Sequence, residues 1–417
     1  MIQALFAINT SGETLLEKHY RGVTPKAVFD PFIDALNKTT NPDDVAPVIV
    51  GPRHCLISIY RQRIFFLAIV QTDVTPLLVF EFLHRAVDTF VEYFGDFNEA
   101  SIKEHAVTYF ELLDEMMDNG FPLTTESNIL KELILPPSII RSVVNTFASQ
   151  ANVASAVPTG QLSSIPWRRM GVRYATNAMY IDFIEELDVI IDRNGATISA
   201  EVQGEVRCNS NLSGMPDLVL SFANPRVFDD ISFHPCVRFK RWESERVLSF
   251  VPPDGHFKLC SYRVGSTTAP LQIPVYVKPM ISFSAGVCKL EVNVGFKQNM
   301  GKAVEDVVVI IPLPPSAISA NISQTVGNAV LDPVSKNLRW DIGKIPLNKL
   351  PVLKGSVTLQ TSMPLPEANP TITLEFKIQQ LATSGIKVNK LDLYGEKYKP
   401  FKGVKYLTKS GRFQVRS

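Results

Sequence analysis

The spacing of apolar residues changes once along the chain, and this change constrains the fold more than any other feature. Up to about residue 133, apolar residues recur in several segments at three- and four-residue intervals, as Leu83, Val87 and Phe90 do, which is typical of amphipathic helices. Beyond Trp167 this spacing nearly vanishes, and short β-rich runs separated by turns replace it. The 417 residues are enough for roughly two or three domains. We therefore expect an α+β domain followed by an all-β domain.

Residues 1–140 are predicted to form a five-stranded antiparallel sheet with helices on its faces. The strand-like runs are residues 2–8, 15–20, 46–50, 55–60 and 64–70. The helical segments are residues 26–36, 75–94, 99–117 and 126–133. The second helix has clear boundaries, because Thr75 offers an N-cap hydroxyl, Pro76 suits the first turn and Gly95 ends the helix.

Residues 141–165 are predicted to be a flexible linker. Asn, Ala, Ser, Val and Gln dominate residues 141–164, and no acidic residue occurs there. Such a biased composition is typical of a linker. Trp167-Arg168-Arg169 follows and begins the second part of the chain.

Residues 166–417 are predicted to form an elongated β-sandwich of two subdomains. Asn194-Gly195 is a strong hairpin turn, and most of the 29 prolines fall in this half. The predicted strands are residues 178–184, 187–191, 197–207, 218–222, 247–250, 271–280, 282–294, 307–311, 338–340, 356–361, 371–377, 387–393 and 404–415.

The first of these strands carries the clearest pattern. Alternation places its apolar residues, Met179, Ile181 and Phe183, on one face. Tyr180 and Asp182 then share the opposite face. A strand of this kind can bind an extended peptide by edge pairing, with side-chain pockets for specificity. An ordinary core strand with one solvated Asp has the same pattern, so these residues alone leave both interpretations open.

The formal net charge of +1 hides an asymmetry between the two halves. Residues 1–140 contain 10 Lys and Arg and 19 Asp and Glu, a net charge of −9. Residues 141–417 contain the other 32 Lys and Arg and 22 Asp and Glu, a net charge of +10. A basic domain can face nucleic acid or an anionic membrane surface, or its charges can be spread over a solvated surface. Because no interleaved aromatic and basic pattern is present, we expect no nucleic-acid partner.

Other features indicate a cytosolic protein without catalytic machinery. The five cysteines show no CxxC pair, which favours reduced, buried thiols. The longest apolar run, Ile64 to Val70, is too short to cross a bilayer, and the first residues lack the basic start and long apolar stretch of a signal peptide. The motifs HExxH, GxGxxG after a strand and GxSxG are absent from the sequence, so we expect no enzyme activity, no cofactor and no metal.

Short motifs, in order along both halves, resemble the medium, or mu, subunits of heterotetrameric clathrin-type adaptor complexes. The start, Leu5-Phe6-Ala7-Ile8-Asn9 with Lys18-His19-Tyr20-Arg21, is similar to their N-terminal longin domain, and Trp167-Arg168-Arg169 is similar to the beginning of their mu homology domain. Further matches are Ser213-Gly214-Met215-Pro216-Asp217, His234-Pro235-Cys236-Val237-Arg238-Phe239, Ser249-Phe250-Val251-Pro252-Pro253-Asp254-Gly255, Ser261-Tyr262-Arg263 and Ser410-Gly411-Arg412-Phe413. Within the family, the chain most resembles the medium subunit of the third-class complex.

The resemblance implies a longin-like assembly domain at residues 1–140 and a cargo-binding mu homology domain at residues 166–417. It also implies a heterotetramer with two large subunits and one small subunit. An Arf-family GTPase would recruit that complex to the cytosolic face of Golgi, endosomal and vesicle membranes. The third-class complex sorts cargo to lysosomes and related organelles. Thr159 lies where some relatives carry a phosphorylated Thr, which makes it a candidate regulatory residue, although an inert spacer is equally compatible.

In this family the mu homology domain binds sorting signals of the form Tyr-x-x-Φ, where Φ is a bulky apolar residue. The resemblance assigns Tyr180, Asp182 and Lys405 to the signal tyrosine, with Lys405 where the best-known members have Arg. The residues assigned to the Φ pocket are Met179, Ile181, Val388, Leu391 and Val404. Gly403 replaces a Trp that packs on the tyrosine ring, and Asn209 replaces a Lys that helps to hold the hydroxyl. We therefore expect weak binding.

Two other interpretations stay open at this point. A coat or endocytic interaction subunit of the same architecture would bind no tyrosine signal. It is distinguished by whether Asp182 and Lys405 face each other across paired strands. An enzyme with an unrecognised site would instead show perturbed titratable groups clustered in a deep pocket.

Overall fold

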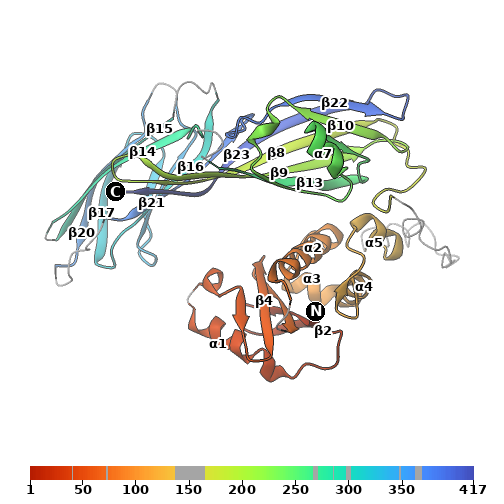
Figure 1. Cartoon of the computed structure of the whole chain (residues 1–417). Coiled ribbons are helices and arrows are strands. Elements are labelled where there is room, and N and C mark those ends of the chain that lie inside the picture. Colours follow the sequence, from red (N-terminus) through yellow and green to blue (C-terminus); the bar gives the residue numbers. More distant parts are fainter. Residues whose placement is uncertain are drawn as a thin grey trace, which may run out of the picture. The chain divides into compact units, whose positions relative to one another are not determined.

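The computed structural model divides the chain into two compact units, Met1–Arg169 and Met170–Ser417 (Figure 1). The structure describes residues 1–39, 41–71, 74–136, 165–265, 271–284, 286–296, 302–346, 349–361 and 369–417. The predicted linker lies outside these residues except for Ile165, and Thr159 lies outside them as well. None of the helices in the described ranges combines the length and the apolar character that crossing a membrane requires.

A five-stranded antiparallel sheet is the centre of the first unit, as predicted. Its strands are β1 (Ile2–Asn9), β2 (Thr14–His19), β3 (Val48–Val50), β4 (His54–Arg61) and β5 (Ile64–Gln71), in the spatial order β2-β1-β5-β4-β3. The central strands are buried on both faces because alternate residues enter two separate cores. In β5, Phe66 and Ala68 pack into one core. Phe65 and Leu67 pack into the other.

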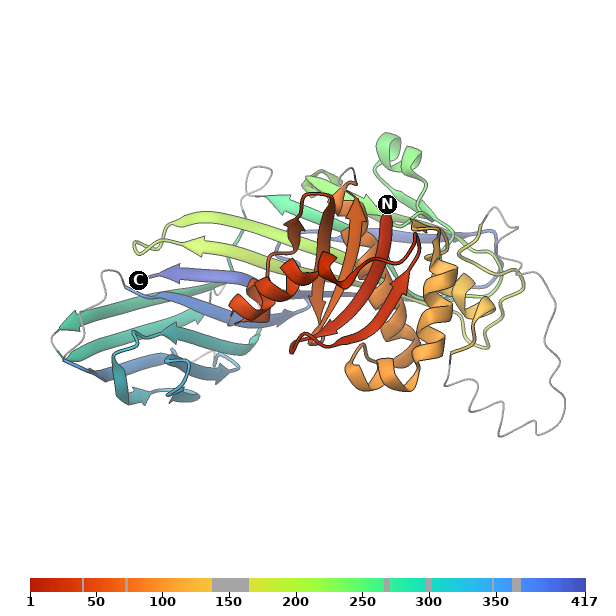
Figure 2. The ribbon, with the colours of Figure 1, turned by 90° about the horizontal axis from the view of Figure 1, so that it is seen from below.

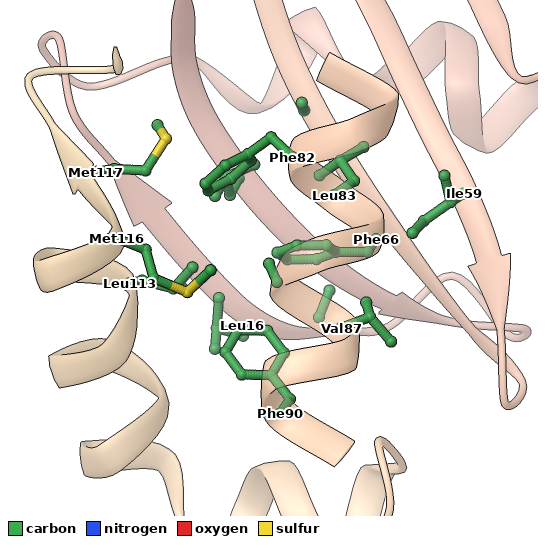
Figure 3. Close-up of a cluster of buried hydrophobic side chains, with 14 of the residues drawn as sticks. Leu16, Ile59, Phe66, Phe82, Leu83, Val87, Phe90, Leu113, Met116 and Met117 are labelled. Atoms are coloured by element: carbon green, nitrogen blue, oxygen red, sulfur yellow. The ribbon is translucent and has the colours of Figure 1, made fainter. Parts of the chain in front are cut away.

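Helices cover both faces of this sheet. On one face, α1 (Asp30–Lys38) buries Phe32 and Leu36. The elements on or beside the other face are α2 (Pro76–Phe94), α3 (Glu99–Glu104), α4 (Ala106–Met116), the hairpin β6 (Met117–Asp118) and β7 (Phe121–Pro122), and α5 (Ser127–Leu133). Figure 3 shows Phe90 of α2 and Leu113 of α4 in the core that also holds Phe66. Two short 3-10 turns, η1 (Lys26–Val28) and η2 (Pro42–Asp44), complete the unit.

Two helices and one predicted helix cap differ from the sequence-based prediction. The first α-helix begins only at Asp30, after a 3-10 turn, because Pro31 has no N–H to donate to the preceding turn. The predicted long third helix is divided at His105, whose ring stacks on Phe94 with centroids 5.0 Å apart. Thr75 does precede α2, but its side chain makes no capping hydrogen bond.

A nine-stranded sheet runs through the second unit, in the order β11-β13-β9-β8-β23-β21-β16-β19-β18. Its strands are β8 (Ala178–Ile191), β9 (Thr197–Asn211), β11 (Asp230–Phe233), β13 (Gly255–Gly265), β16 (Val304–Pro312), β18 (Asn328–Leu331), β19 (Asn337–Gly343), β21 (Thr371–Gln379) and β23 (Phe401–Arg416). The smaller sheets are β12-β10-β22, from β10 (Asp217–Phe222), β12 (Leu248–Phe250) and β22 (Val388–Tyr394), and β14-β15-β20-β17, from β14 (Val275–Ser284), β15 (Val287–Phe296), β17 (Ala317–Gln324) and β20 (Val352–Leu359). In Figure 1 each smaller sheet lies in a different lobe of this unit, as the predicted two-subdomain sandwich requires.

The strand β23 connects the two lobes. It pairs with β8 in parallel from Phe401 to Val415, and its second half also pairs with β21 on the opposite side. Figure 2 shows these long strands extending through the unit. Segments far apart in the sequence are therefore neighbours along the whole length of β8.

Several strand predictions were wrong in this unit. The predicted break in β8 does not exist, because Glu185 is buried with hydrogen-bonding partners instead of forming a turn. The turn after β14 follows Ser284, and Pro279 lies inside the strand, where an edge position tolerates its missing N–H. The prediction missed β11, β13, β17, β18 and two further elements, η3 (Pro225–Val227) and α7 (Phe239–Glu245).

Candidate peptide-binding site

The parallel pair of β8 and β23 brings together the residues assigned to the signal tyrosine. Tyr180 lies opposite Gly403, and Asp182 lies opposite Lys405. On its other side, Tyr180 lies opposite Asn209 of β9. Side chains of residues opposite each other in a sheet point to the same face, so all five residues share one face. It is the more exposed face of β8, since Met179, Ile181 and Phe183 on the reverse are buried.

Tyr180 occupies the space that a side chain at position 403 would need. A Cβ atom built on Gly403 would lie 2.8 Å from Cδ1 of Tyr180. The Tyr180 ring also meets the ring of Phe401, with centroids 5.6 Å apart. Tyr180 is 37% exposed and Phe401 is 58% exposed. The result is a pair of partly exposed aromatic rings beside the backbone of β23.

Phe401 was missed by sequence reasoning. The predicted strand began at residue 404, whereas β23 begins at Phe401. Period-two alternation carried back from Lys405 would have placed Phe401 on the same face as Gly403. The signal that could have identified Phe401 is its apolar ring at a position that should face solvent.

Asp182 lies between two cations in the register, Lys405 on β23 and Arg207 on β9. Arg207 forms an ion pair with Glu205, with Nη2 and Oε1 2.5 Å apart. Within the described part of the chain, the side chain of Asp182 forms neither a hydrogen bond nor an ion pair within 4.0 Å, and neither does the side chain of Lys405. The Asp182 carboxylate is thus a hydrogen-bond acceptor without an internal donor.

The residues assigned to the Φ pocket lie on the reverse face of the pair and on the facing strand β22. Met179 and Ile181 are fully buried on β8, and Val404 lies opposite Ile181 on β23. Across from them, β22 carries the partly buried Val388 and the buried Leu391. All five are apolar, and they come from three strands. Met179 and Ile181 expose no surface of their own, so they can form only the floor of an apolar subsite.

Side-chain hydrogen bonds hold β22 to β23. The backbone N–H of Val388 donates to the Tyr406 hydroxyl at 2.9 Å. The Lys402 ammonium donates to the backbone carbonyl of Leu391. Backbone pairing of β22 involves β10 and not β23. The spacing between β22 and β23 is therefore set by side chains.

One edge of β23 is open beside the site. The strand β21 pairs with β23 only from Leu407 onward, and Gln380 N–H bonds the Tyr406 carbonyl just before that point. For residues 401–405, no described strand pairs on that side. An extended peptide could add there, and its residues i and i+3 would then point to opposite faces.

The motif Ser213-Gly214-Met215-Pro216-Asp217 anchors the connection from β22 to β23. The Tyr398 hydroxyl donates to the Ser213 carbonyl at 2.6 Å. The Met215 N–H donates to Glu396 Oε1 at 2.9 Å. A side chain on Gly214 would collide with that carboxylate, because its Cβ would lie 2.0 Å from Glu396 Oε1. The motif thus supports the first residues of β23 from outside the site.

The more exposed face of the same sheet also has a hollow of about 630 Å³, farther along β8. Six of its charged side chains neutralise one another in pairs, Lys409 with Glu186, Arg263 with Glu201, and Arg207 with Glu205. Asp230 also lines the hollow. Among the described residues, no three His, Cys, Asp or Glu side chains are placed to hold a metal ion. The hollow therefore offers paired charges on an open sheet face.

Comparison with known proteins agrees with this architecture. The family described as adaptor complexes medium subunit matches residues 165–417, and that described as clathrin adaptor complex small chain matches residues 1–135. The AP-3 complex subunit mu-1 of Gallus gallus is 58% identical, and that of Homo sapiens is 57% identical, each over 100% of both chains. A chain in a homology model of the full-length AP-3 complex, in an intermediate open conformation, has a TM-score of 0.65 at 18% identity over 100% of both chains, which shows a shared fold. With matches that span both units, the chain belongs to the adaptor complexes medium subunit family, and it is similar over its full length to mu subunits of AP-3 complexes.

Proposed function

We propose that this chain is the non-catalytic, cargo-binding subunit of its adaptor complex. In this proposal it recognises Tyr-x-x-Φ signals in the cytoplasmic tails of membrane proteins. The cargo then enters vesicles bound for lysosomes and lysosome-related organelles. The observation that carries the proposal is the register of β8 and β23, with Tyr180 beside Gly403 and Asp182 beside Lys405 at an open strand edge.

The tyrosine side of the site suits a phenol. A phenol needs apolar contact for its ring and a partner for its hydroxyl. Tyr180 and Phe401 offer ring contact, and the unpaired carboxylate of Asp182 offers the acceptor. The same carboxylate would repel a phosphotyrosine dianion.

The x-x spacing of the signal follows from strand geometry. A peptide paired with residues 401–405 places its tyrosine on the face of Asp182 and its residue i+3 on the reverse face. That reverse face carries the apolar side chain of Val404, and the facing strand β22 carries Val388 and Leu391. A bulky apolar residue at the fourth position is the chemistry that such a subsite selects.

Binding should be weak. Gly403 has no side chain to cover the tyrosine ring, and Asn209 carries no charge. We expect a dissociation constant in the micromolar range or poorer, about −8 kcal/mol or less in magnitude. Several simultaneous membrane contacts would then supply the missing affinity.

The test is calorimetric titration of the full chain with a Tyr-x-x-Leu peptide and with the same peptide carrying Ala or phosphotyrosine in place of Tyr. We expect measurable binding of the tyrosine peptide alone. If the chain binds all three peptides equally, or none of them, the alternative of an interaction subunit without tyrosine-signal binding takes precedence.

We propose that a large subunit of the complex binds around the first unit. Exposed apolar side chains on it suit burial in a complex: Val23, Val50, Leu77, Val107, Phe121 and Leu123. The complex would contain two large subunits and one small subunit. Size-exclusion chromatography of the full chain alone should show self-association, and co-expression with the partner subunits should abolish it. A monodisperse, stable chain on its own would contradict this role.

The surroundings of the site suit an anionic membrane surface. Exposed lysines lie on β22, on β23 and in the connection between them: Lys390, which pairs with Asp392, and Lys397, Lys399, Lys402 and Lys405. Each basic residue near such a surface contributes about 1 kcal/mol of attraction. We further propose that the complex works on the cytosolic face of Golgi, endosomal and vesicle membranes, recruited by an Arf-family GTPase. Recruitment of the assembled complex to liposomes should then require the GTP-bound form of that GTPase.

A further inference from the structure

A row of polar residues crosses the buried face of the nine-stranded sheet behind the proposed site. The register aligns Tyr262 of β13, Gly204 of β9, Glu185 of β8 and Thr408 of β23. Glu185 and Thr408 are 0% exposed, and Tyr262 is 4% exposed. Burying such groups costs several kcal/mol each unless they are hydrogen-bonded, so their partners indicate what the row is for.

Gly204 makes the row possible. A Cβ atom built on Gly204 would lie 2.1 Å from Cζ of Tyr262. The Tyr262 ring therefore lies flat over β9 where a side chain is missing. This lets the Tyr262 hydroxyl reach the next strand and donate to Glu185 Oε1 at 2.8 Å.

The remaining partners come from the connection between β21 and β22, residues 380–387. The Ser384 N–H donates to Glu185 Oε2 at 3.0 Å, and the Ser384 hydroxyl bonds Oε1 of the same carboxylate. Next along β23, the Thr408 hydroxyl donates to the Leu381 carbonyl at 2.9 Å and accepts from the Thr383 N–H at 3.2 Å. The buried row thus holds this connection at three successive points.

That connection leads directly into β22. Ser384 Oγ also accepts the Ile386 N–H at 3.2 Å, and the Lys387 carbonyl accepts the Ala223 N–H at 2.9 Å. Val388, the first residue of β22, follows at once. Since β22 has no backbone pairing with β23, its distance from β23 depends on the side-chain bonds of Tyr406 and Lys402 and on the connection that the row holds.

We propose that Glu185 is a positioning residue for the Φ subsite. Through Ser384 it holds residues 380–387, and these set the gap between β22 and β23 that decides which apolar residue fits. Glu185 touches no ligand in this arrangement. The proposal rests on the proposed tyrosine-signal function, and it concerns the Φ position only. Loss of the contact should therefore relax Φ selectivity and leave the tyrosine preference unchanged.

The experiment compares Tyr-x-x-Leu with Tyr-x-x-Ala, and Tyr-x-x-Leu with Phe-x-x-Leu, in binding to the full chain. Three buried carbons should favour Leu over Ala by roughly 50-fold in the natural chain, at about fourfold per carbon. In Glu185→Gln and in Ser384→Ala we expect this ratio to fall to roughly tenfold or less. The ratio of the affinities for Tyr-x-x-Leu and Phe-x-x-Leu should not change. Ser384→Ala keeps the carboxylate and serves if Glu185→Gln does not fold.

A core substitution in the other lobe is the matched control. Val309 of β16 is 0% exposed, and Val309→Ala lowers stability without touching residues 380–387. It should leave the ratio of Leu to Ala unchanged. An unchanged ratio in Glu185→Gln and Ser384→Ala, or an equal fall in Val309→Ala, overturns the proposal.

Hydrogen exchange separates this proposal from the function on which it rests. In Glu185→Gln the amides of Thr383, Ser384, Ile386 and Val388 should exchange faster, and in Val309→Ala they should not. If the natural chain binds no tyrosine peptide, the proposed function fails, and exchange alone then decides whether Glu185 holds the connection. Unchanged exchange at these amides refutes the positioning role.

Discussion

Replacing Asp182 with Ala should weaken the binding of a Tyr-x-x-Leu peptide by roughly tenfold. Hydrogen bonds to a charged group contribute about 1.5–3 kcal/mol. Asp182 is partly exposed, and water competes at such a position, so the lower value of about 1.5 kcal/mol applies. This corresponds to about one decade in the dissociation constant.

The peptide with Phe in place of Tyr makes the measurement specific. Phe has no hydroxyl, so Asp182→Ala should leave its affinity unchanged, and the natural chain should prefer Tyr over Phe by the same roughly tenfold. The four affinities form a double-mutant cycle whose coupling energy isolates the bond between the hydroxyl and the carboxylate. The phosphotyrosine peptide should be rejected by the natural chain and rejected less by Asp182→Ala.

Glu186→Ala is the matched control for charge. Glu186 lies on the same face of β8 four residues along, about 13 Å away at 3.3 Å per residue, and it pairs with Lys409 at 2.5 Å. At physiological salt, interactions beyond about 8 Å are screened, so the control should bind all peptides normally. The reasoning is refuted if Glu186→Ala lowers the affinity for the Tyr peptide as much as Asp182→Ala does. It is also refuted if Asp182→Ala lowers the affinity for the Phe peptide as much as for the Tyr peptide.

Four further predictions concern other parts of the chain. Phe401→Ala should weaken the Tyr and Phe peptides alike by roughly two- to tenfold in calorimetry, because ring contacts contribute about 0.5–1.5 kcal/mol; an effect on the Tyr peptide alone would contradict a pure ring contact. Burial raises the pKa of Glu185 above its usual 4.5, and the groups that face it, Tyr262, Thr383 and Ser384, are uncharged near neutral pH. The folded state therefore keeps the proton longer than the unfolded state, and stability falls as pH rises above 4.5 toward the raised pKa. Glu185→Gln lacks this loss, so its melting temperature relative to the natural chain should increase from pH 4.5 to 7.5, and a constant difference would count against burial of an ionisable group. Binding of the full chain to liposomes should increase with anionic lipid and decrease with salt; indifference to both would exclude electrostatic membrane contact. Thr159→Ala should reduce cargo uptake in cells if phosphorylation there regulates the chain, whereas unchanged uptake and membrane recruitment would favour an inert spacer.

The sequence determined the classes of structure and their order along the chain. Apolar spacing is a local property, and a helix or strand must follow it to bury one face. The five-stranded sheet, the helices beside it and the β-rich second half could therefore be predicted. The face shared by Tyr180 and Asp182 could be predicted for the same reason, because alternation along a strand needs no knowledge of its neighbours.

Sequence patterns failed where a charge was buried or a strand was exposed. Glu185 and Glu186 interrupt an apolar run and suggested a break, yet β8 continues because Glu185 accepts hydrogen bonds from Tyr262 of β13 and from Ser384 in the connection between β21 and β22. The edge strand β17 has little alternation in burial, which leaves no periodic signal to detect. The start of β23 was placed too late for a similar reason, since Lys402, Gly403 and Lys405 are not strand formers.

Only the tertiary structure decided the partners in the site. Asp182 lies on the first strand of the second unit and Lys405 on the last, so the two residues are far apart in the sequence. A shift of one residue in the register would turn Lys405 to the reverse face. Nothing local to either strand sets that register. It follows from the packing of both strands against the same core, together with the buried hydrogen bonds of Glu185 and Thr408. The sequence thus gives the residue types at the candidate site. Their arrangement depends on long-range strand pairing, which local sequence patterns do not predict.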